Sequence, residues 1–375
     1  MTLASIRVSR FVPFAATALV ALAGLAIAGP LTPPSGAVSS SYKTLGEVEP
    51  RIAINLTNTP GDGNSLFRIT QPGSYYLTGN VVGVNGKTGI EVEASNVTID
   101  LNGFSLIGVG SALVAISPSS VVQNIEVCNG SISNWPSNAV SLQTASRVVL
   151  RDLRVTSNGG FGIVVGPGSR IADCIASDNV SHGFYVSSNS VVANCVGSSN
   201  GGCGILAQDG VTIVGSTVTG NSSAGISVGT GCSVRACTSN DNNNVGILVG
   251  IGSIVEHCVV RANDLDGIRT SDRSRIVGNI CSANGQTVTT GAGIRMTGSG
   301  NYLEGNNSTG QDTGYDADAL GNILVRNTAA GNTDNWALVA GNRCLVVNAT
   351  AAGVISGNSG GVSLGSTDPN ANFTY

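Results

Sequence analysis

The sequence predicts an all-β fold: a right-handed parallel β-helix, or solenoid, with coils of about 21 residues that are capped at both ends. Three observations lead to this prediction. Glycines recur 21 residues apart, and each is followed by a large apolar residue. Asparagines recur with the same spacing. Between them, apolar and polar residues alternate with a period of two, which is typical of short strands. A repeat unit of this length that holds only strands and turns is typical of a β-solenoid.

Four positions of the repeat keep their character through the middle of the chain. The glycine column is Gly162, Gly183, Gly204, Gly225, Gly246 and Gly267. The apolar column is Ile171, Val192, Ile213, Val234, Val255 and Ile276. The thiol column is Cys174, Cys195, Ser216, Cys237 and Cys258. The asparagine column is Asn158, Asn179, Asn200, Asn221, Asn242, Asn263 and Asn284. Strands of successive coils stack about 4.8 Å apart, so each column should form a ladder. Crossovers between parallel strands are nearly always right-handed, which sets the expected hand.

The residue type of each column suggests its role. Ile and Val should fill a narrow core. A buried asparagine ladder can pass hydrogen bonds from coil to coil and satisfy the backbone of the turns. The thiols should pack as small apolar groups, because parallel side chains one coil apart do not converge as a disulfide requires. Five further cysteines lie outside the thiol column, and for them a disulfide stays open: Cys128, Cys203, Cys232, Cys281 and Cys344.

The N-terminus has the features of an export signal. Arg7 and Arg10 precede an apolar run that ends at Ala26-Ile27-Ala28, a small-residue cleavage site. We therefore expect a secreted or periplasmic protein with no membrane segment after cleavage. The expected parts of the chain are a signal peptide at 1–28, a linker at 29–50, an N-terminal cap at 51–88, the β-helix at 89–347 and a C-terminal covering tail at 348–375.

Composition excludes several functions. The formal net charge is −4, and no basic run or stripe is present, so nucleic acid is not an expected partner. Lysine occurs only at Lys43 and Lys87, before the repeat body, which excludes a lysine-based lyase site on the coils. His182 and His257 fall in different columns and do not form a metal-binding set.

Several segments carry a family resemblance. They are 69–80 (ITQPGSYYLTGN), 97–104 (VTIDLNGF), the iterated Asn-Gly-Gly-x-Gly-Ile units and the ending 368–375 (DPNANFTY). In these the chain resembles the bacterial secreted right-handed parallel β-helix repeat proteins, which are similar in fold to the pectate-lyase-like superfamily. The resemblance covers nearly all of the expected mature chain. It implies the fold but no activity, because that superfamily includes lyases, polygalacturonases, epimerases and non-catalytic surface proteins.

The candidate site lies where an outward-facing position, two residues after the repeat glycine, changes from apolar to basic at Arg269 and Arg295. One interpretation is a carbohydrate groove, with Asp264 and Asp266 as an acid or metal pair and Arg269 as a third catalytic candidate. In this interpretation Arg269 and Arg295 hold an anionic sugar. Three further binding candidates complete this set: Arg273, Arg275 and the exposed aromatic Tyr185. The other interpretation is a solvated surface whose opposite charges are matched.

A second acidic group could bind Ca²⁺, although an ordinary polar loop is the alternative: Asp312, Asp316 and Asp318. No other cofactor is expected. Taken together, the sequence favours an exported structural or polysaccharide-binding module at the cell surface or in the periplasm, whose partner is a polysaccharide or another surface component. The alternative is a polysaccharide-active enzyme, namely a lyase, a glycoside hydrolase or a uronate epimerase.

Overall fold

The computed structural model describes residues 49–285, 291–349, 355–357 and 368–374. The chain divides into two units, residues 1–50 and 51–375. The expected signal peptide and all but the last two residues of the expected linker lie outside the described residues. Within the described part, every regular element is a strand, and no helix is long and apolar enough to cross a bilayer.

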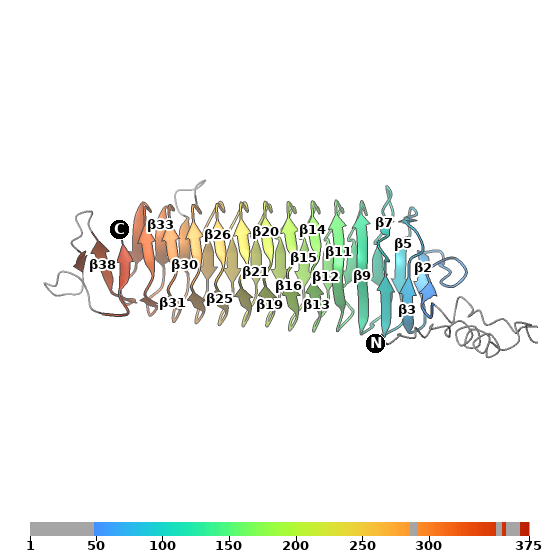
Figure 1. Cartoon of the computed structure of the whole chain (residues 1–375), viewed down its shortest axis with the longest axis horizontal. Helices are drawn as coiled ribbons and strands as arrows, with labels where there is room; N and C mark the ends of the chain where they lie inside the picture. The colour runs from blue at the N-terminus through green and yellow to red at the C-terminus, as the bar shows by residue number, and fades with distance from the viewer. Residues whose placement is uncertain (1–48, 286–290, 350–354, 358–367, 375) are drawn as a thin grey trace, which may run out of the picture. The chain divides into compact units, whose positions relative to one another are not determined.

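Each regular coil contributes three short strands to two parallel sheets, as in β12 (Ile163–Val165), β13 (Arg170–Ala172) and β14 (Ile175–Ser177). The first strand joins a 13-stranded sheet, here sheet B, and the other two join a 27-stranded sheet, here sheet A. Ile163 pairs with Phe184 in the next coil, a step of one 21-residue repeat. Figure 1 shows the coils of residues 51–375 stacked along one axis. The predicted solenoid is confirmed.

The strands of sheet B pair in chain order, whereas in the regular coils each strand of sheet A pairs with its counterpart in the next coil. Besides β12, sheet B contains β2 (Ser65–Ile69), β5 (Thr88–Val92), β8 (Ile116–Pro118), β10 (Val140–Leu142), β15 (Phe184–Val186), β18 (Ile205–Ala207), β21 (Ile226–Val228), β24 (Ile247–Val249), β27 (Ile268–Thr270), β30 (Ala292–Met296), β33 (Thr313–Ala317) and β36 (Asp334–Leu338). Besides β13 and β14, sheet A contains β1 (Ile52–Ala53), β3 (Gly73–Tyr76), β4 (Val81–Val82), β6 (Val97–Asp100), β7 (Ser105–Ile107), β9 (Ile125–Ser133), β11 (Val149–Thr156), β16 (Val191–Ala193), β17 (Val196–Ser198), β19 (Thr212–Val214), β20 (Thr217–Thr219), β22 (Ser233–Arg235), β23 (Thr238–Asn240), β25 (Ile254–Glu256), β26 (Val259–Arg261), β28 (Arg275–Val277), β29 (Ile280–Ser282), β31 (Tyr302–Glu304), β32 (Asn307–Thr309), β34 (Ile323–Val325), β35 (Thr328–Ala330), β37 (Arg343–Cys344), β38 (Val346–Ala349), β39 (Ile355–Gly357) and β40 (Asn372–Thr374).

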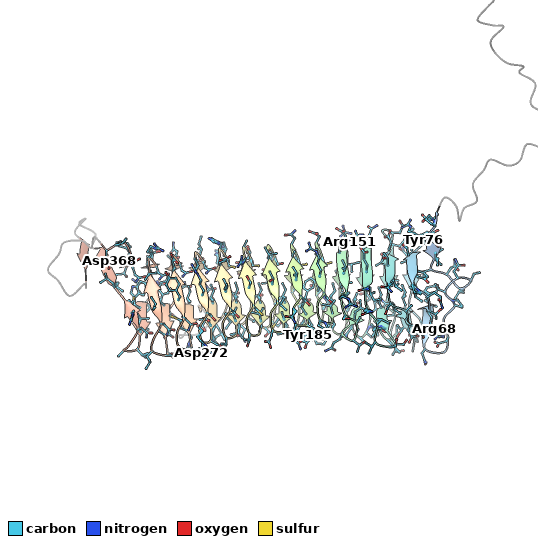
Figure 2. The ribbon with its side chains drawn as sticks, turned by 90° about the horizontal axis from the view of Figure 1, so that it is seen from below. Arg68, Tyr76, Arg151, Tyr185, Asp272 and Asp368 are labelled. Atoms are coloured by element: carbon cyan, nitrogen blue, oxygen red, sulfur yellow. The ribbon has the colours of Figure 1, made fainter. Side chains whose placement is uncertain are left out.

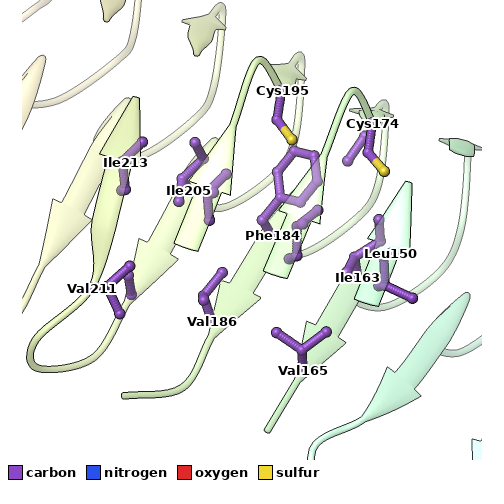
Figure 3. Close-up of a cluster of buried hydrophobic side chains, with 14 of the residues drawn as sticks. Leu150, Ile163, Val165, Cys174, Phe184, Val186, Cys195, Ile205, Val211 and Ile213 are labelled. Carbon is purple, nitrogen blue, oxygen red and sulfur yellow. The ribbon is translucent and has the colours of Figure 1, made fainter. Parts of the chain in front are cut away.

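The core is a stack of aliphatic rows with thiols among them. In Figure 3, Ile163, Phe184 and Ile205 form one row, and Cys174 and Cys195 lie beside it. All nine cysteines are free, and eight of them are buried. The structure therefore contains no disulfide among the five cysteines for which the sequence left one open, and the thiol column packs as predicted.

The asparagine ladder is buried, as predicted from Asn158 to Asn284. Asn221 illustrates the pattern. Its Oδ1 accepts hydrogen bonds from the backbone N–H and Nδ2 of Asn200, at 3.1 and 3.0 Å. Its Nδ2 donates to Oδ1 of Asn242, at 2.9 Å, and to the backbone carbonyl of Gly197, at 3.0 Å. Each asparagine thus links its own turn to the neighbouring coils.

A second asparagine ladder continues the thiol column toward the C-terminus. Asn279 accepts the backbone N–H of Cys258 at 2.9 Å, and Asn306, Asn327 and Asn372 follow in the same pattern. This ladder is hidden in the sequence because the insertion between 285 and 291 shifts the spacing, and because the last member comes from the distant tail.

The coil begins earlier and ends later than the predicted boundaries. Strands β2 and β3, inside the expected cap at 51–88, pair in parallel with β5 and β6, so they already belong to the coil. At the other end, β40 of the expected covering tail pairs in parallel with β35 and β38. Residues 350–354, 358–367 and 375 of that tail lie outside the described residues.

Candidate functional site

One face of sheet B carries a row of side chains that point outward from successive strands. Strand pairing aligns its members, which we call the outward row: Tyr185, Leu206, Ser227, Leu248, Arg269, Arg295 and Asp316. Ile268 and Thr270, on either side of Arg269, are fully buried, whereas the Arg269 side chain is 30% exposed. The row is therefore accessible to a ligand. The strands of Arg269 and Arg295 are paired, although the two residues are separated by more than one 21-residue repeat.

At one end of the outward row lies an aromatic cluster, formed by Phe161, His182 and Tyr185. The rings of Phe161 and His182 are stacked, with centroids 5.3 Å apart, and Tyr185 meets Phe161 edge-on at 5.9 Å. The Tyr185 hydroxyl accepts a hydrogen bond from Nε2 of Gln208, at 2.9 Å. Tyr185 is half-buried rather than fully exposed. This cluster combines apolar ring surface with polar groups, which suits a sugar ring.

His182 is held in one orientation within the aromatic cluster. Its Nδ1 accepts the backbone N–H of Cys203 at 2.7 Å, so in the neutral imidazole the proton lies on Nε2. Partial burial lowers the pKa of His182 from its usual value of 6.5. His182 was not among the site residues predicted from the sequence. A signal was available, because the position before the repeat glycine holds Phe161 and then His182 in successive coils.

At the other end lies a charged cluster of five residues: Asp266, Arg269, Arg295, Asp316 and Asp318. Nε of Arg269 lies 2.5 Å from Oδ2 of Asp266. Nε of Arg295 lies 2.9 Å from Oδ2 of Asp318 and 3.5 Å from Oδ2 of Asp316. The structure thus brings the expected arginines together with two aspartates that the sequence assigned to a separate Ca²⁺ site.

The two aspartates expected as an acid or metal pair do not share a strand. Asp264 and Asp266 both precede β27, in the turn that leads into it. Asp266 is buried and accepts the backbone N–H of Ala292 at 2.8 Å through its other oxygen. Both oxygens of Asp266 therefore already have donors. The position of Asp266 is that of a residue that orients Arg269.

Asp316 has the least usual environment of the charged cluster. Burial and the neighbouring carboxylate of Asp318 raise the pKa of Asp316, and Arg295 partly offsets this effect. The same carboxylates raise the pKa of Arg295. These surroundings favour the protonated form of Asp316.

The remaining candidates lie apart from these two clusters. Arg275 belongs to β28 of sheet A, where it pairs with Glu304 at 3.3 Å and lies over the ring of Tyr302. Arg273 is in the turn before β28, in a left-handed conformation. Neither continues the outward row. Figure 2 shows the two sides of the coil: Tyr185 and Asp272 lie on one side, and Arg151 and Tyr76 lie on the opposite side.

The three expected Ca²⁺ ligands do not converge. Asp316 and Asp318 flank Arg295, whereas Asp312 lies in the turn before β33, and its Oδ2 is buried without a hydrogen-bond partner. Within the described ranges, no three His, Cys, Asp or Glu side chains are grouped so that they could hold a metal ion.

Among the described residues, several surface cavities lie near sheet A. One, of 340 Å³, is lined by residues that include Asn129, Asp152, Arg154 and Asp173. Another, of 400 Å³, is lined by residues that include Asn124 and Arg147. Neither contains a residue of the outward row. We select the outward row as the candidate site for its continuous combination of ring surface, donors and acceptors, rather than for the depth of a cavity.

Comparison with known proteins supports the fold. The family described as right handed beta helix region matches residues 57–185 and 123–239. The A-module of the mannuronan C-5 epimerase AlgE4 from Azotobacter vinelandii superposes with a TM-score of 0.60, at 15% identity, over 72% of this chain and 87% of the module. The periplasmic alginate epimerase AlgG gives 0.47, at 13% identity, over 81% and 83%. The Dettilon tailspike protein gives 0.47, at 14% identity, over 81% and 61%. No curated protein sequence matches the chain. At 15% identity the match to the AlgE4 module establishes the fold alone.

Proposed function

Since this chain is a right-handed β-helix protein with the pectate-lyase-like fold, we propose that it is an exported module that binds a polysaccharide along the outward row of sheet B. The supporting observation is the row itself, which leads from the aromatic cluster to the charged cluster without a break in strand pairing. The export signal expected from the sequence is consistent with this role.

The spacing of the outward row suits an extended polymer. Successive side chains stand about 4.8 Å apart, so Tyr185 and Arg295, five coils apart, are separated by about 24 Å. The spacing of about 4.8 Å between successive side chains is close to the length of one pyranose unit in an extended polysaccharide. Leu206 and Leu248 provide apolar surface, and the flanking clusters provide ring faces, donors and acceptors. A linear polysaccharide could therefore contact each coil in turn.

The structural relative with the higher similarity is compatible with this proposal. AlgE4 is named a mannuronan epimerase, and mannuronan is a polysaccharide. The shared fold makes a polysaccharide a reasonable ligand class for this chain as well.

The first test is Tyr185→Ala. Removing the ring should weaken retention on a polysaccharide that binds the wild-type protein by about tenfold, or 1.4 kcal/mol, because aromatic stacking contributes on this scale. Binding is measured on immobilised alginate, polygalacturonate, a neutral glucan and a galactomannan. Tyr302→Ala, on sheet A, is the matched control and should bind as the wild-type protein does. Equal retention of the wild-type and Tyr185→Ala proteins on every polymer would exclude this end of the row.

A second candidate function is proton transfer on a bound polysaccharide, as in a lyase or epimerase. The observation that favours it is His182, whose neutral imidazole presents a fixed Nε2–H and stacks on Phe161, the ring that Tyr185 also contacts. Because Nδ1 already accepts the Cys203 N–H, this imidazole can donate a hydrogen bond from Nε2 but cannot take up a proton in place. It would therefore stabilise the negative charge that develops on a uronate oxygen, while another group acts as the base.

The second candidate predicts a product. Wild-type protein should alter alginate or polygalacturonate, seen as a new unsaturated chromophore or a change in uronate configuration by NMR. His182→Phe, which keeps a ring for stacking but removes the Nε2–H donor, should lose about 100-fold in rate. His257→Phe is the control. An unchanged rate in His182→Phe would show that His182 does not stabilise the reaction, and no product with any polymer would leave binding as the function.

A further inference from the structure

We propose that the polysaccharide is uncharged where it meets the charged cluster, so that Arg269 and Arg295 contact sugar hydroxyl groups and not carboxylates. This inference rests on the proposed function and names the class of its ligand. It differs from the expectation drawn from the sequence, in which the two arginines grip an acidic sugar.

The charged cluster holds more carboxylates than guanidinium groups. Asp266, Asp316 and Asp318 carry three carboxylates, against the two guanidinium groups of Arg269 and Arg295. At neutral pH the cluster therefore has a net charge of −1. The turns before and after β27 add Asp264 and Asp272, against Arg273 alone. A polymer with a carboxylate on every sugar would approach a surface of its own sign and be repelled.

Both arginines already donate hydrogen bonds to carboxylates of the cluster. Nε of Arg269 is used by Asp266 and that of Arg295 by Asp318. A bidentate grip on an incoming carboxylate through Nε would have to replace these contacts. For Arg269 the replacement would leave the carboxylate of Asp266, only 1% exposed, without its cation, which is strongly unfavourable.

The Arg269–Asp266 and Arg295–Asp318 ion pairs still have groups that can bind a sugar. Each arginine keeps its terminal Nη donors, and the carboxylate beside Arg295 is accessible, since the Asp318 side chain is 41% exposed. A vicinal diol both accepts and donates hydrogen bonds, so it can receive from a guanidinium and donate to the adjacent carboxylate. A neutral sugar can therefore hydrogen-bond to both the arginine and the aspartate without breaking the ion pair between them.

The rest of the outward row agrees with this assignment. Between the two clusters it presents Leu206, Ser227 and Leu248, none of which would stabilise an anion. At the aromatic end, the Tyr185 hydroxyl and Gln208 amide are uncharged. No position from Tyr185 to Leu248 of the row offers a cation for a second or third acidic sugar.

The experiment compares one polymer backbone with its charge removed or present. Fully methyl-esterified and de-esterified polygalacturonate are immobilised in parallel, with a neutral glucan, a galactomannan and the cationic polymer chitosan beside them. We expect the full-length protein to be retained on at least one neutral polymer, and about tenfold less on the de-esterified form than on the esterified form at low salt. The difference should shrink as salt rises, because screening weakens repulsion.

Two variants test the charge argument directly. Asp318→Asn changes the net charge of the charged cluster from −1 to zero. It should reduce the difference in retention between the esterified and de-esterified forms of polygalacturonate. Asp173→Asn makes the same change of charge on the sheet A side and should leave this difference unaltered.

The outcomes separate this inference from the proposed function. Tighter retention on the de-esterified form, weakening as salt rises, or tighter retention on chitosan than on any neutral polymer, would overturn the assignment of a neutral ligand while leaving polysaccharide binding intact. Retention on none of the polymers would contradict the proposed function, and the assignment with it.

Discussion

At the scale of single residues, the asparagines of the first ladder matter most, because each one serves three coils. Asn221 accepts from Asn200 above it, donates to Asn242 below it and binds the carbonyl of Gly197. All of these groups are buried, so none can turn to water if its partner is lost. The sequence predicted this ladder from spacing alone. It could not predict the tautomer of His182, which depends on a backbone N–H one coil away.

We expect Asn221→Ala to lower the free energy of unfolding by about 1–3 kcal/mol, because it leaves buried donors and a carbonyl without partners. Denaturant titration followed by circular dichroism measures the change. Ser222→Ala, at the next and exposed position, is the control and should change stability little. An unaltered midpoint in Asn221→Ala would mean that the ladder contributes nothing beyond what water could replace.

At the scale of the strand and turn, the shape of a coil depends on close packing at the repeat glycines and on sharp corners. The corner between β13 and β14 is made by Asp173 in a left-handed conformation, and Asn194 and Gly215 repeat it in the next two coils. The sequence showed that turns lay there but not that a carboxylate, an amide and a glycine would adopt the same conformation. Likewise, the paired charges at Arg269 and Arg295 could not be assigned before Asp316 and Asp318 were placed on the adjacent strand and turn.

The repeat glycine before each sheet B strand has no room for a side chain. A Cβ at Gly246 would lie 2.4 Å from Cγ1 of Val260 and 2.7 Å from the carbonyl oxygen of Gly267. Gly246→Ala should therefore reduce the free energy of unfolding by about 1–3 kcal/mol through overpacking. At Gly79, by contrast, nothing lies within 4 Å of an added Cβ. If Gly246→Ala and Gly79→Ala unfold at the same denaturant concentration, the crowding at Gly246 is relieved by movement of the coil.

At the scale of the whole molecule, the β-helix is a one-dimensional stack in which each coil contacts only its neighbours. This regularity explains why the fold could be predicted over most of the chain from four columns of residues. The ends could not be predicted, because the coils before residue 89 and the strand at Asn372–Thr374 depart from the 21-residue spacing. The candidate site could be predicted in part. The outward row followed from the repeat spacing, but the contacts that determine the charge of its charged cluster did not.

The stack also determines the chemistry of its thiols. All nine cysteines are free, and burial raises the pKa of Cys128 to about 11 and that of Cys344 to about 12. A thiol reagent should therefore react slowly with the native protein, beginning at Cys344, the one cysteine that is only partly buried. After denaturation it should titrate nine thiols. A titre of seven or fewer without reductant would reveal a disulfide that the structure does not contain.

The asparagine ladder has a consequence for the length of the molecule. Since every regular coil presents the same acceptor to the coil before it and the same donors to the coil after it, neighbouring coils are interchangeable. Removing residues 201–221 would place Asn200 against Asn242, a contact of the kind that already joins each successive pair. Duplicating one 21-residue unit would add a coil whose asparagine makes the same contacts with both of its neighbours. Such a molecule can grow or shrink in steps of one coil, about 4.8 Å, without redesigning its interior. The length of the outward row is therefore a quantity that duplication and loss of repeat-encoding DNA can adjust.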